Sequence, residues 1–396
     1  MKIFVKILIK TLAFFSISVE FLIGFSNILW ADDYRHKMTT EFNVDGTGYY
    51  GRLAITGDFN NDGRDEMLYL RMSETYMEYN WSSKTKRRNV AYAKEGIRRA
   101  TRDPDEWTAR FVTYTMLKSG KRGASWSVSF NGNRRLAPVG CIQPSQIIPT
   151  NLNNDSYTDF VIVCHGYDDK PWPGEKSVVA LSNGPNNYDV KTFSGVGFYH
   201  DGDVADFNND GNMDILLVDQ GKNSKKAEVY LNDGNGNFIK SKKYFSKSAT
   251  FQGAYGTEII DINGDGLFDV GMFGHENIES SKPHKTMILV NTGSNTFSTD
   301  NKLVVPAING WGTVHDMFVE GDNLFVLRTS SPKRHRGNLI QQVDINTMKT
   351  VATLKNSNMN WYSRIFRKTG GKFGSLMNTS NDLDFKLVNG KIALAK

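Results

Sequence analysis

Short apolar runs alternate with turn-forming segments along most of this chain. Runs such as 160–163 and 215–218 have strand length and are apolar throughout, which is typical of strands buried on both faces. Asn-Gly and Asp-Gly pairs between such runs favour tight hairpin turns. Apolar positions at helical spacing are nearly absent after residue 31. The pattern therefore predicts an all-β protein.

Residues 1–31 differ from the rest of the chain. Lys2, Lys6 and Lys10 precede a mostly apolar stretch that ends near Trp30, which is the arrangement of a secretory signal peptide. We expect a cleaved signal, with an uncleaved N-terminal anchor as the alternative. The protein should then be secreted, periplasmic or displayed at the cell surface, without further membrane insertion.

Four acidic segments share one pattern and organise the chain. They cover residues 58–66, 151–159, 206–214 and 261–269, and the last three begin 55 residues apart. The first gap is longer, which indicates an insertion at about 72–108. A motif that recurs at a fixed period is the signature of a repeat fold.

Each repeat also contains a predicted hairpin, in 180–188, 230–238 and 289–297. With the strands that enter and leave the acidic segment, every unit has four strands, like the blade of a β-propeller. The same spacing reaches 314–327, which has strands but no acidic loop, and the tail from 361 to 396 divides into four short strands. We expect one propeller over 32–396 with six blades, or seven if 34–50 and the insertion supply more strands.

The acidic segments have the spacing of a calcium loop. Oxygen ligands at positions 1, 3, 5 and 9, the carbonyl at position 7 and a turn glycine at position 6 can surround a hard cation. An EF-hand would need Glu at position 12, where strand residues stand instead. The predicted Ca²⁺ ligands are Asp58, Asn60, Asp62, Arg64 and Glu66; Asp206, Asn208, Asp210, Asn212 and Asp214; and Asp261, Asn263, Asp265, Leu267 and Asp269.

The second segment departs from this pattern. Asn151 replaces the first aspartate and Ser156 replaces the turn glycine, which leaves Asn153, Asp155 and Asp159 as ligands. We expect three strong calcium sites and one weak site. The alternative is that all four segments are only good turns, but four such segments in register favour calcium.

The motif Asp-Phe-Asn-Asn-Asp-Gly-x-x-Asp before an apolar strand resembles the FG-GAP/VCBS repeats of integrin α-subunit propellers and bacterial surface proteins. The segment Phe251-Gln-Gly-Ala-Tyr-Gly256 is similar to the phrase that names the repeat. The resemblance covers about 50–330. It implies structural calcium loops on one face, ligands on the opposite face, and commonly seven blades.

Strand direction predicts which residues lie on the face away from the acidic loops. The strand that leaves each loop ends on that face, and the strand that enters the loop starts there. Aromatic, basic and imidazole groups on one rim suit sugars or acidic polymers, although each could equally pack between blades. The candidate ligand-binding residues are Arg71, His165, Trp172, His200, Tyr255, His275, Trp311 and Arg328.

The two cysteines, Cys141 and Cys164, flank the second acidic segment on its entering and leaving strands. Antiparallel pairing of those strands would bring the cysteines together, and an exported protein is oxidised. We therefore predict a disulfide between them.

Three classes of function remain open. A binding module for a glycan or a cell-surface protein is favoured by the family resemblance and by the aromatic residues of the rim. Nucleophile and phosphate-loop motifs are absent from the sequence. A polysaccharide lyase or glycosidase would need His165, His200, His275 and His315 to converge as an acid–base or metal cluster. A structural partner in an envelope complex is the third. The net charge of +6 is modest, so no nucleic-acid partner is expected.

Overall fold

The protein is described from a computed structural model. The chain divides into two units, 1–32 and 33–396, and only the second is described. The described residues are 42–43, 50–59, 61, 63, 66–71, 110–116, 122–126, 129–130, 144–166, 174–184, 187–220, 226–247, 249, 254–276, 285–330, 337–356, 366–369, 372–375 and 383–394. The predicted signal (1–31) and insertion (72–108) lie outside them.

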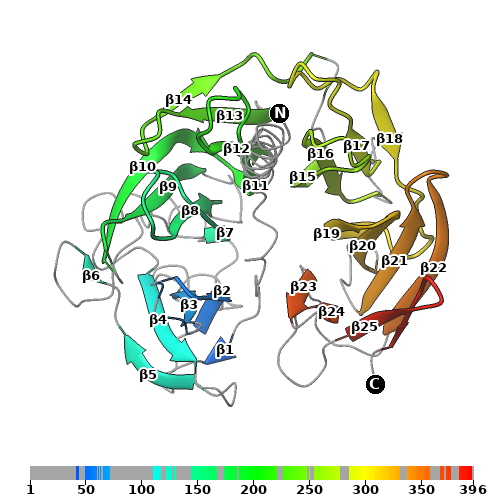
Figure 1. Ribbon diagram of the computed structural model, residues 1–396, viewed down its shortest axis with the longest axis horizontal. Helices are drawn as coiled ribbons and strands as arrows, with labels where there is room; N and C mark the ends of the chain where they lie inside the picture. The colour runs from blue at the N-terminus through cyan, green and yellow to red at the C-terminus, as the bar shows by residue number, and fades with distance from the viewer. Residues whose placement is uncertain are drawn as a thin grey trace, which may run out of the picture. The chain divides into compact units, whose positions relative to one another are not determined.

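The described strands form six sheets, and in five of them neighbouring strands follow chain order (Figure 1). The first sheet contains β1 (Phe42–Asn43), β2 (Tyr50–Gly57), β3 (Glu66–Arg71), β4 (Arg110–Met116) and β5 (Arg122–Trp126). The second contains β7 (Pro144–Thr150), β8 (Asp159–Cys164), β9 (Glu175–Ser182) and β10 (Asn187–Gly197), with β6 (Ser129–Phe130) beside β10. The third contains β11 (Tyr199–Ala205), β12 (Asp214–Asp219), β13 (Lys226–Asn232) and β14 (Phe238–Ser241).

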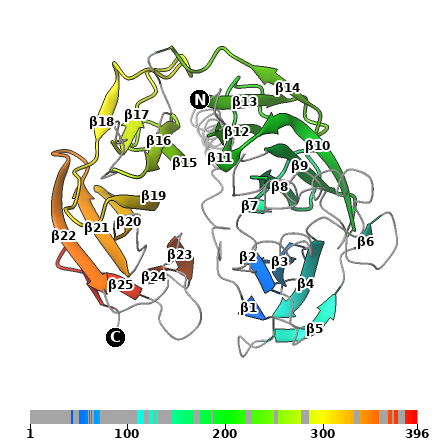
Figure 2. The same cartoon turned by 180° about the vertical axis from the view of Figure 1, so that it is seen from behind.

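The last three sheets each have four strands, which Figure 2 shows from behind. The fourth contains β15 (Ala254–Ile260), β16 (Asp269–Gly274), β17 (Met287–Leu289) and β18 (Lys302–Val304). The fifth contains β19 (Thr313–Glu320), β20 (Asn323–Thr329), β21 (Asn338–Asp344) and β22 (Lys349–Asn356). The sixth contains β23 (Phe366–Thr369), β24 (Lys372–Ser375), β25 (Leu383–Val388) and β26 (Lys391–Leu394).

Consecutive sheets contact one another through their first long strands. β2 contacts β7, β7 contacts β11, β11 contacts β15, β15 contacts β19, and β19 contacts β23. The second strand of each middle sheet is the core: every residue of β8, β12 and β16 is buried. Continuous apolar runs form these strands because both of their faces are covered by neighbouring sheets.

The first strand of a sheet has one edge without a strand partner, and side chains from the preceding sheet satisfy its backbone. Gln146 of β7 accepts a hydrogen bond from the Gly202 N–H at 2.8 Å, and Asp203 of β11 accepts one from the Ile259 N–H at 2.7 Å. Buried N–H groups need such acceptors. Both acceptors are buried, so these bonds fix the register between neighbouring sheets.

Three further features bear on the sequence predictions. The hairpin predicted in 289–297 is longer, because its outer strand β18 begins at Lys302 and Phe297 instead bridges Phe245. The predicted loop-free repeat is present as β19 and β20. No described helix combines the length and apolar character that crossing a membrane requires.

Candidate functional site

The four acidic segments occupy equivalent places in the first four sheets. Each connects the first long strand to the second: β2 to β3, β7 to β8, β11 to β12 and β15 to β16. The glycines at position 6, which are Gly63, Gly211 and Gly266, have positive φ. Residues with a side chain rarely adopt this conformation. The turn glycine of the predicted motif is therefore a conformational requirement of these loops.

The 206–214 loop is held by its own side chains. Asp206 Oδ2 accepts the Gly211 N–H at 2.8 Å, and Asp210 Oδ1 accepts the Asn212 N–H at 2.8 Å. Asn208 donates its amide to Asp210 Oδ2 at 2.8 Å. The 261–269 loop repeats the three bonds through Asp261, Asn263 and Asp265.

In the second, third and fourth loops, the carboxylate at position 9 is buried and joins two parts of its sheet. Asp214 accepts the N–H groups of Phe207 at 2.9 Å and Asn232 at 2.8 Å, and so joins the start of the loop to β13. Asp159 does the same with Leu152 and Ser182, both at 2.6 Å, and Asp269 does so with Ile262 at 2.8 Å and Asn291 at 2.7 Å. The sequence predicted a calcium ligand here and missed this structural role, although the invariant spacing of the three aspartates was the available signal.

Burial is the main cause of the raised pKa values of these three carboxyl groups. All three carboxyl groups are fully inaccessible to solvent, and this raises the pKa of Asp214 to about 7 and that of Asp159 and Asp269 to about 6. The backbone hydrogen bonds lower the pKa of Asp214, while the charges of Asp206 and Asp210 raise it further. A cation near the three carboxylates would favour their ionised form.

The second loop differs where its sequence differs. Ser156 has no positive φ, and no backbone bond to Asn151 equivalent to the Gly211–Asp206 bond is formed. Asn151 donates its amide to the Asp155 carbonyl at 2.5 Å, while its Oδ1 is buried without a hydrogen-bond partner. Position 1 of this loop thus holds a neutral oxygen that lacks a donor.

Neighbouring loops contact one another, which places them at one end of their sheets. Asn61 donates to the Ser156 carbonyl, and Asn154 donates to Asn212 Oδ1 at 2.8 Å. Asn232 donates to the Leu152 carbonyl at 2.8 Å, and Asn295 donates to the Phe207 carbonyl at 2.9 Å. The asparagines that fill these turns therefore also join one repeat to the next.

The donor set of the loops fits a hard cation. Within the described residues, no three His, Cys, Asp or Glu side chains form a ready metal-binding group. The loops add amide and backbone oxygens to their carboxylates, and the unpartnered Asn151 Oδ1 is a donor of the same kind. Asn60, Asp62 and Arg64 lie outside the described residues, and only the backbone of Glu66 is described, in β3.

The opposite end of the sheets carries a repeated irregularity. The pairing of the first and second long strands shifts register once in each of the first five sheets, at the end away from the turn that joins them. The residue skipped is Arg52, Ser145, His200, Tyr255 or His315. A β-bulge re-aims a side chain, and bulges are over-represented beside binding sites.

Two of the predicted ligand-binding residues, His165 and His200, meet at this end. His165, which follows β8, lies with its Nε2 3.2 Å from the Nε2 of His200 in β11. His275 Nδ1 lies 2.8 Å from Thr313 Oγ1, across the boundary between the fourth and fifth sheets. Arg71 ends β3 and Tyr255 lies in β15, where only their backbones are described. Trp172 lies outside the described residues.

The structure places Arg328 in the interior and not on a ligand-binding rim. Its guanidinium is fully buried and pairs with Glu276 through contacts of 2.6 and 3.2 Å. It also donates to Gln341 Oε1 at 2.7 Å and to the carbonyls of Pro306 and Trp311. A buried arginine needs such a complete set of acceptors, and this set leaves no exposed atom for a ligand. Trp311 is half-buried and contributes its backbone to this network.

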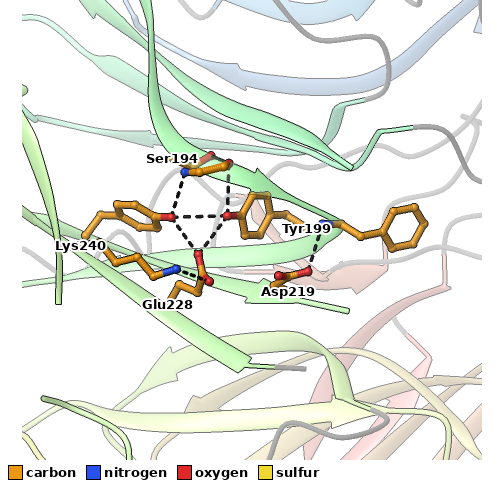
Figure 3. Close-up of polar contacts among 8 residues, drawn as sticks. Ser194, Tyr199, Asp219, Glu228 and Lys240 are labelled. Carbon is orange, nitrogen blue, oxygen red and sulfur yellow. Dashed lines mark hydrogen bonds and ion pairs between the residues drawn. The ribbon is translucent and has the colours of Figure 1, made fainter. Parts of the chain in front are cut away.

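A second buried polar network, which no local sequence pattern predicted, joins the second and third sheets (Figure 3). Glu228 Oε2 accepts the hydroxyls of Tyr199 at 2.9 Å and Tyr230 at 2.8 Å, while Lys240 pairs with Oε1. Tyr230 in turn accepts the Gly195 N–H of β10 at 3.1 Å. Burial raises the pKa of Tyr230 to about 12, so its hydroxyl keeps its proton and the network is a structural lock.

Cys164, at the end of β8, is disulfide-bonded, and no described cysteine is free. The chain has one other cysteine, Cys141, which lies outside the described residues.

Comparisons with known proteins agree with this architecture. Residues 206–272 match the model of the FG-GAP-like repeat. The chain is similar in structure to a candidate 6-phosphogluconolactonase from Bacteroides uniformis ATCC 8492, with a TM-score of 0.52 and 12% identity over 92% of this chain and 95% of that one. The Dos1 propeller matches with a TM-score of 0.35 and 8% identity over 66% of this chain and 56% of that one. No curated protein sequence matches.

The similarity to the Bacteroides uniformis structure shows the fold alone. It agrees with the successive antiparallel sheets, whose first long strands contact one another in chain order. The matched segment 206–272 runs from the third acidic loop through the fourth to β16, and so spans the repeated unit itself. The chain therefore carries an FG-GAP-like repeat, and the sheets around that repeat form a β-propeller scaffold.

Proposed function

We propose that this protein is an exported, calcium-stabilised β-propeller that binds an extracellular glycan or cell-surface protein at the end opposite its acidic loops. The observation that carries the proposal is the register shift shared by five sheets at that end. Bulges re-aim side chains and are over-represented beside binding sites, and function concentrates where a rigid scaffold positions such residues.

In this proposal the six sheets are six blades, and calcium braces the loops of the first four. Asp206, Asn208, Asp210, Asp214 and the carbonyl of Asn212 would hold the ion in the third blade. Burial, and to a smaller extent repulsion from Asp206 and Asp210, raises the pKa of Asp214, and the ion would offset that repulsion. The second loop would bind more weakly, because Asn151 offers a neutral oxygen where the others offer a carboxylate.

Ligand binding is tested by screening glycans and intact cells with the protein that lacks residues 1–31. Tyr255→Ala changes a bulge position, whereas Val304→Ala changes an exposed residue of the outer strand β18 and serves as control. We expect binding that Tyr255→Ala weakens about tenfold or more and that Val304→Ala leaves intact. Equal loss in both variants, or no binding to any glycan or cell, would contradict the proposal.

Calcium is tested separately by thermal unfolding with excess calcium and with a chelator. Bound calcium should raise Tm by several degrees, because an ion that binds only the folded state stabilises it. Asp210→Asn should reduce this gain, and Asp300→Asn, an exposed aspartate in the turn before β18, should leave it unchanged. An unchanged Tm in chelator would disprove calcium stabilisation but leave ligand binding open.

A polysaccharide lyase or glycosidase is the second candidate, and the proximity of His165 and His200 favours it. A positioned imidazole can act as general acid or base near neutral pH. Turnover of any polysaccharide that is abolished by His200→Ala would establish this alternative over pure binding.

A further inference from the structure

We propose that His165 and His200 form a binding site for a transition-metal ion such as Zn²⁺, Cu²⁺ or Ni²⁺. The site joins the second and third sheets at the end away from the acidic loops. It goes beyond the proposed function, because its ligands are nitrogens and its ion differs from calcium.

The separation of the two imidazoles suits one ion. Zinc–imidazole bonds of 2.0–2.1 Å in a tetrahedral site place two nitrogens about 3.3 Å apart. The Nε2 atoms of His165 and His200 are 3.2 Å apart. Their ring planes meet at 79° with centroids 4.2 Å apart, and the His200 ring is half-buried.

The tautomer of His165 is favourable for metal binding. Its Nδ1 lies 3.4 Å from the Gly166 carbonyl, which favours the proton on Nδ1. Its Nε2 then accepts the Nε2–H of His200 in the metal-free pair, and an ion would take the place of that proton as it moves to Nδ1 of His200. Metal-binding histidines commonly use the second nitrogen in this way. The Gly166 N–H donates to Glu175 Oε1 at 2.9 Å, which holds this carbonyl in place.

Both histidines stand on constrained backbone. His165 is 2% exposed and directly follows the disulfide-bonded Cys164. His200 is the residue skipped by the bulge of β11. The Phe198 ring packs against both, with centroids 4.0 Å from His165 and 5.0 Å from His200. Ligands fixed in this way lose little entropy when an ion binds.

The ligand type selects the class of ion. Imidazole suits zinc, copper and nickel, whereas calcium and magnesium require oxygen. Among the residues described, no third His, Cys, Asp or Glu completes the group. The described residues therefore supply two nitrogens, and water would fill the coordination positions that remain. Such a site leaves coordination positions of the ion open, so that an external ligand can bind the ion there.

The test is a copper titration of tag-free protein in excess calcium, read by electron paramagnetic resonance and by calorimetry. One equivalent of Cu²⁺ should show coupling to two nitrogens, and zinc should compete for it. His200→Ala should weaken binding at least about tenfold and remove one nitrogen from the spectrum. His315→Ala is the matched control, because His315 is also a bulge residue but contacts Thr329 Oγ1 at 3.0 Å.

His165→Asn is a second variant that keeps a polar side chain at the buried position, and it should lower affinity as His200→Ala does. Thermal unfolding of each variant in calcium checks that the fold persists. The proposal is wrong if the wild type shows no two-nitrogen copper signal, because the pair is then only a hydrogen bond between imidazoles. Equal affinity in folded His200→Ala, or equal loss in His315→Ala, would also overturn it.

Discussion

Asp214 accepts the backbone N–H of Asn232 at 2.8 Å and thereby ties an acidic loop to the third strand of its own sheet. With the Phe207 N–H on its other oxygen, this carboxylate is a structural bracket as well as a proposed calcium ligand. The same arrangement at Asp159 and Asp269 makes it a property of the repeat.

Replacing Asp214 with Asn should destabilise the protein even without calcium. The amide keeps one acceptor but turns its NH₂ group toward a backbone donor, so one buried N–H loses its partner. We expect the free energy of unfolding to fall by about 2 kcal/mol. Urea denaturation in chelator measures this fall, with exposed Asp300→Asn as control. Equal stability of the two variants would show that the bracket contributes little.

The stability of calcium-free protein should decrease as pH rises. The folded-state pKa of Asp159, Asp214 and Asp269 lies at about 6 to 7, above the ordinary 3.8, so the folded state binds more protons than the unfolded chain. Their contribution is complete below about pH 4 and is lost as pH rises through 6 to 7, by up to about 1.4 kcal/mol per pH unit for each group. Urea midpoints in chelator at about pH 5 and pH 8 measure the slope. Stability that rises over this interval would contradict the raised pKa values.

Gly256 should tolerate no side chain. A Cβ at this position would lie 1.9 Å from Cε2 of Phe273, whose ring is buried in the fourth sheet. Gly256→Ala should therefore lower the free energy of unfolding by about 1–3 kcal/mol through overpacking. Gly195→Ala is the matched control, because its nearest neighbour would be 3.9 Å away. Thermal unfolding of both variants should separate them clearly, and similar Tm values would count against this packing.

Reduction should destabilise the second sheet. Cys164 is disulfide-bonded at the end of β8, and we expect its partner to be Cys141. A cross-link of this loop length typically stabilises a protein by about 2–4 kcal/mol. Peptide mapping by mass spectrometry identifies the pair, and Cys141→Ser with Cys164→Ser should lower Tm as reduction does. Detection of two free thiols in the purified protein would disprove the bond.

The local pattern predicted the strands and the placement of the acidic loops because both depend on nearby residues. Positive φ at Gly211 and apolar strands such as β12 follow from the residue types themselves. Three hairpins were expected from Asn and Gly turns, and two of them begin their outer strands where predicted. The third begins later because Phe297 is drawn into contact with Phe245 of another sheet.

Long-range partners limited the prediction of the site. Arg328 stands at the end of a strand that points toward the candidate rim, but Glu276 and Gln341 enclose it in the interior. The Tyr199–Tyr230–Glu228 network depends on a meeting of β10, β11 and β13 that no local spacing encodes. His165 and His200 were predicted on the same face, whereas their direct contact required the packing of two sheets.

The reciprocal asparagine bonds between loops have a consequence for how this chain can be recombined. The Leu152 and Phe207 carbonyls of one repeat are capped by Asn232 and Asn295 of the next, so neither repeat is self-sufficient at its boundary. A repeat transplanted alone would leave a buried carbonyl without a donor. A pair of adjacent repeats keeps the bond between its two members, but its last repeat still needs an asparagine from the repeat that follows. Natural duplications and engineered chimeras should therefore succeed where the junction supplies that asparagine, whatever the number of repeats exchanged.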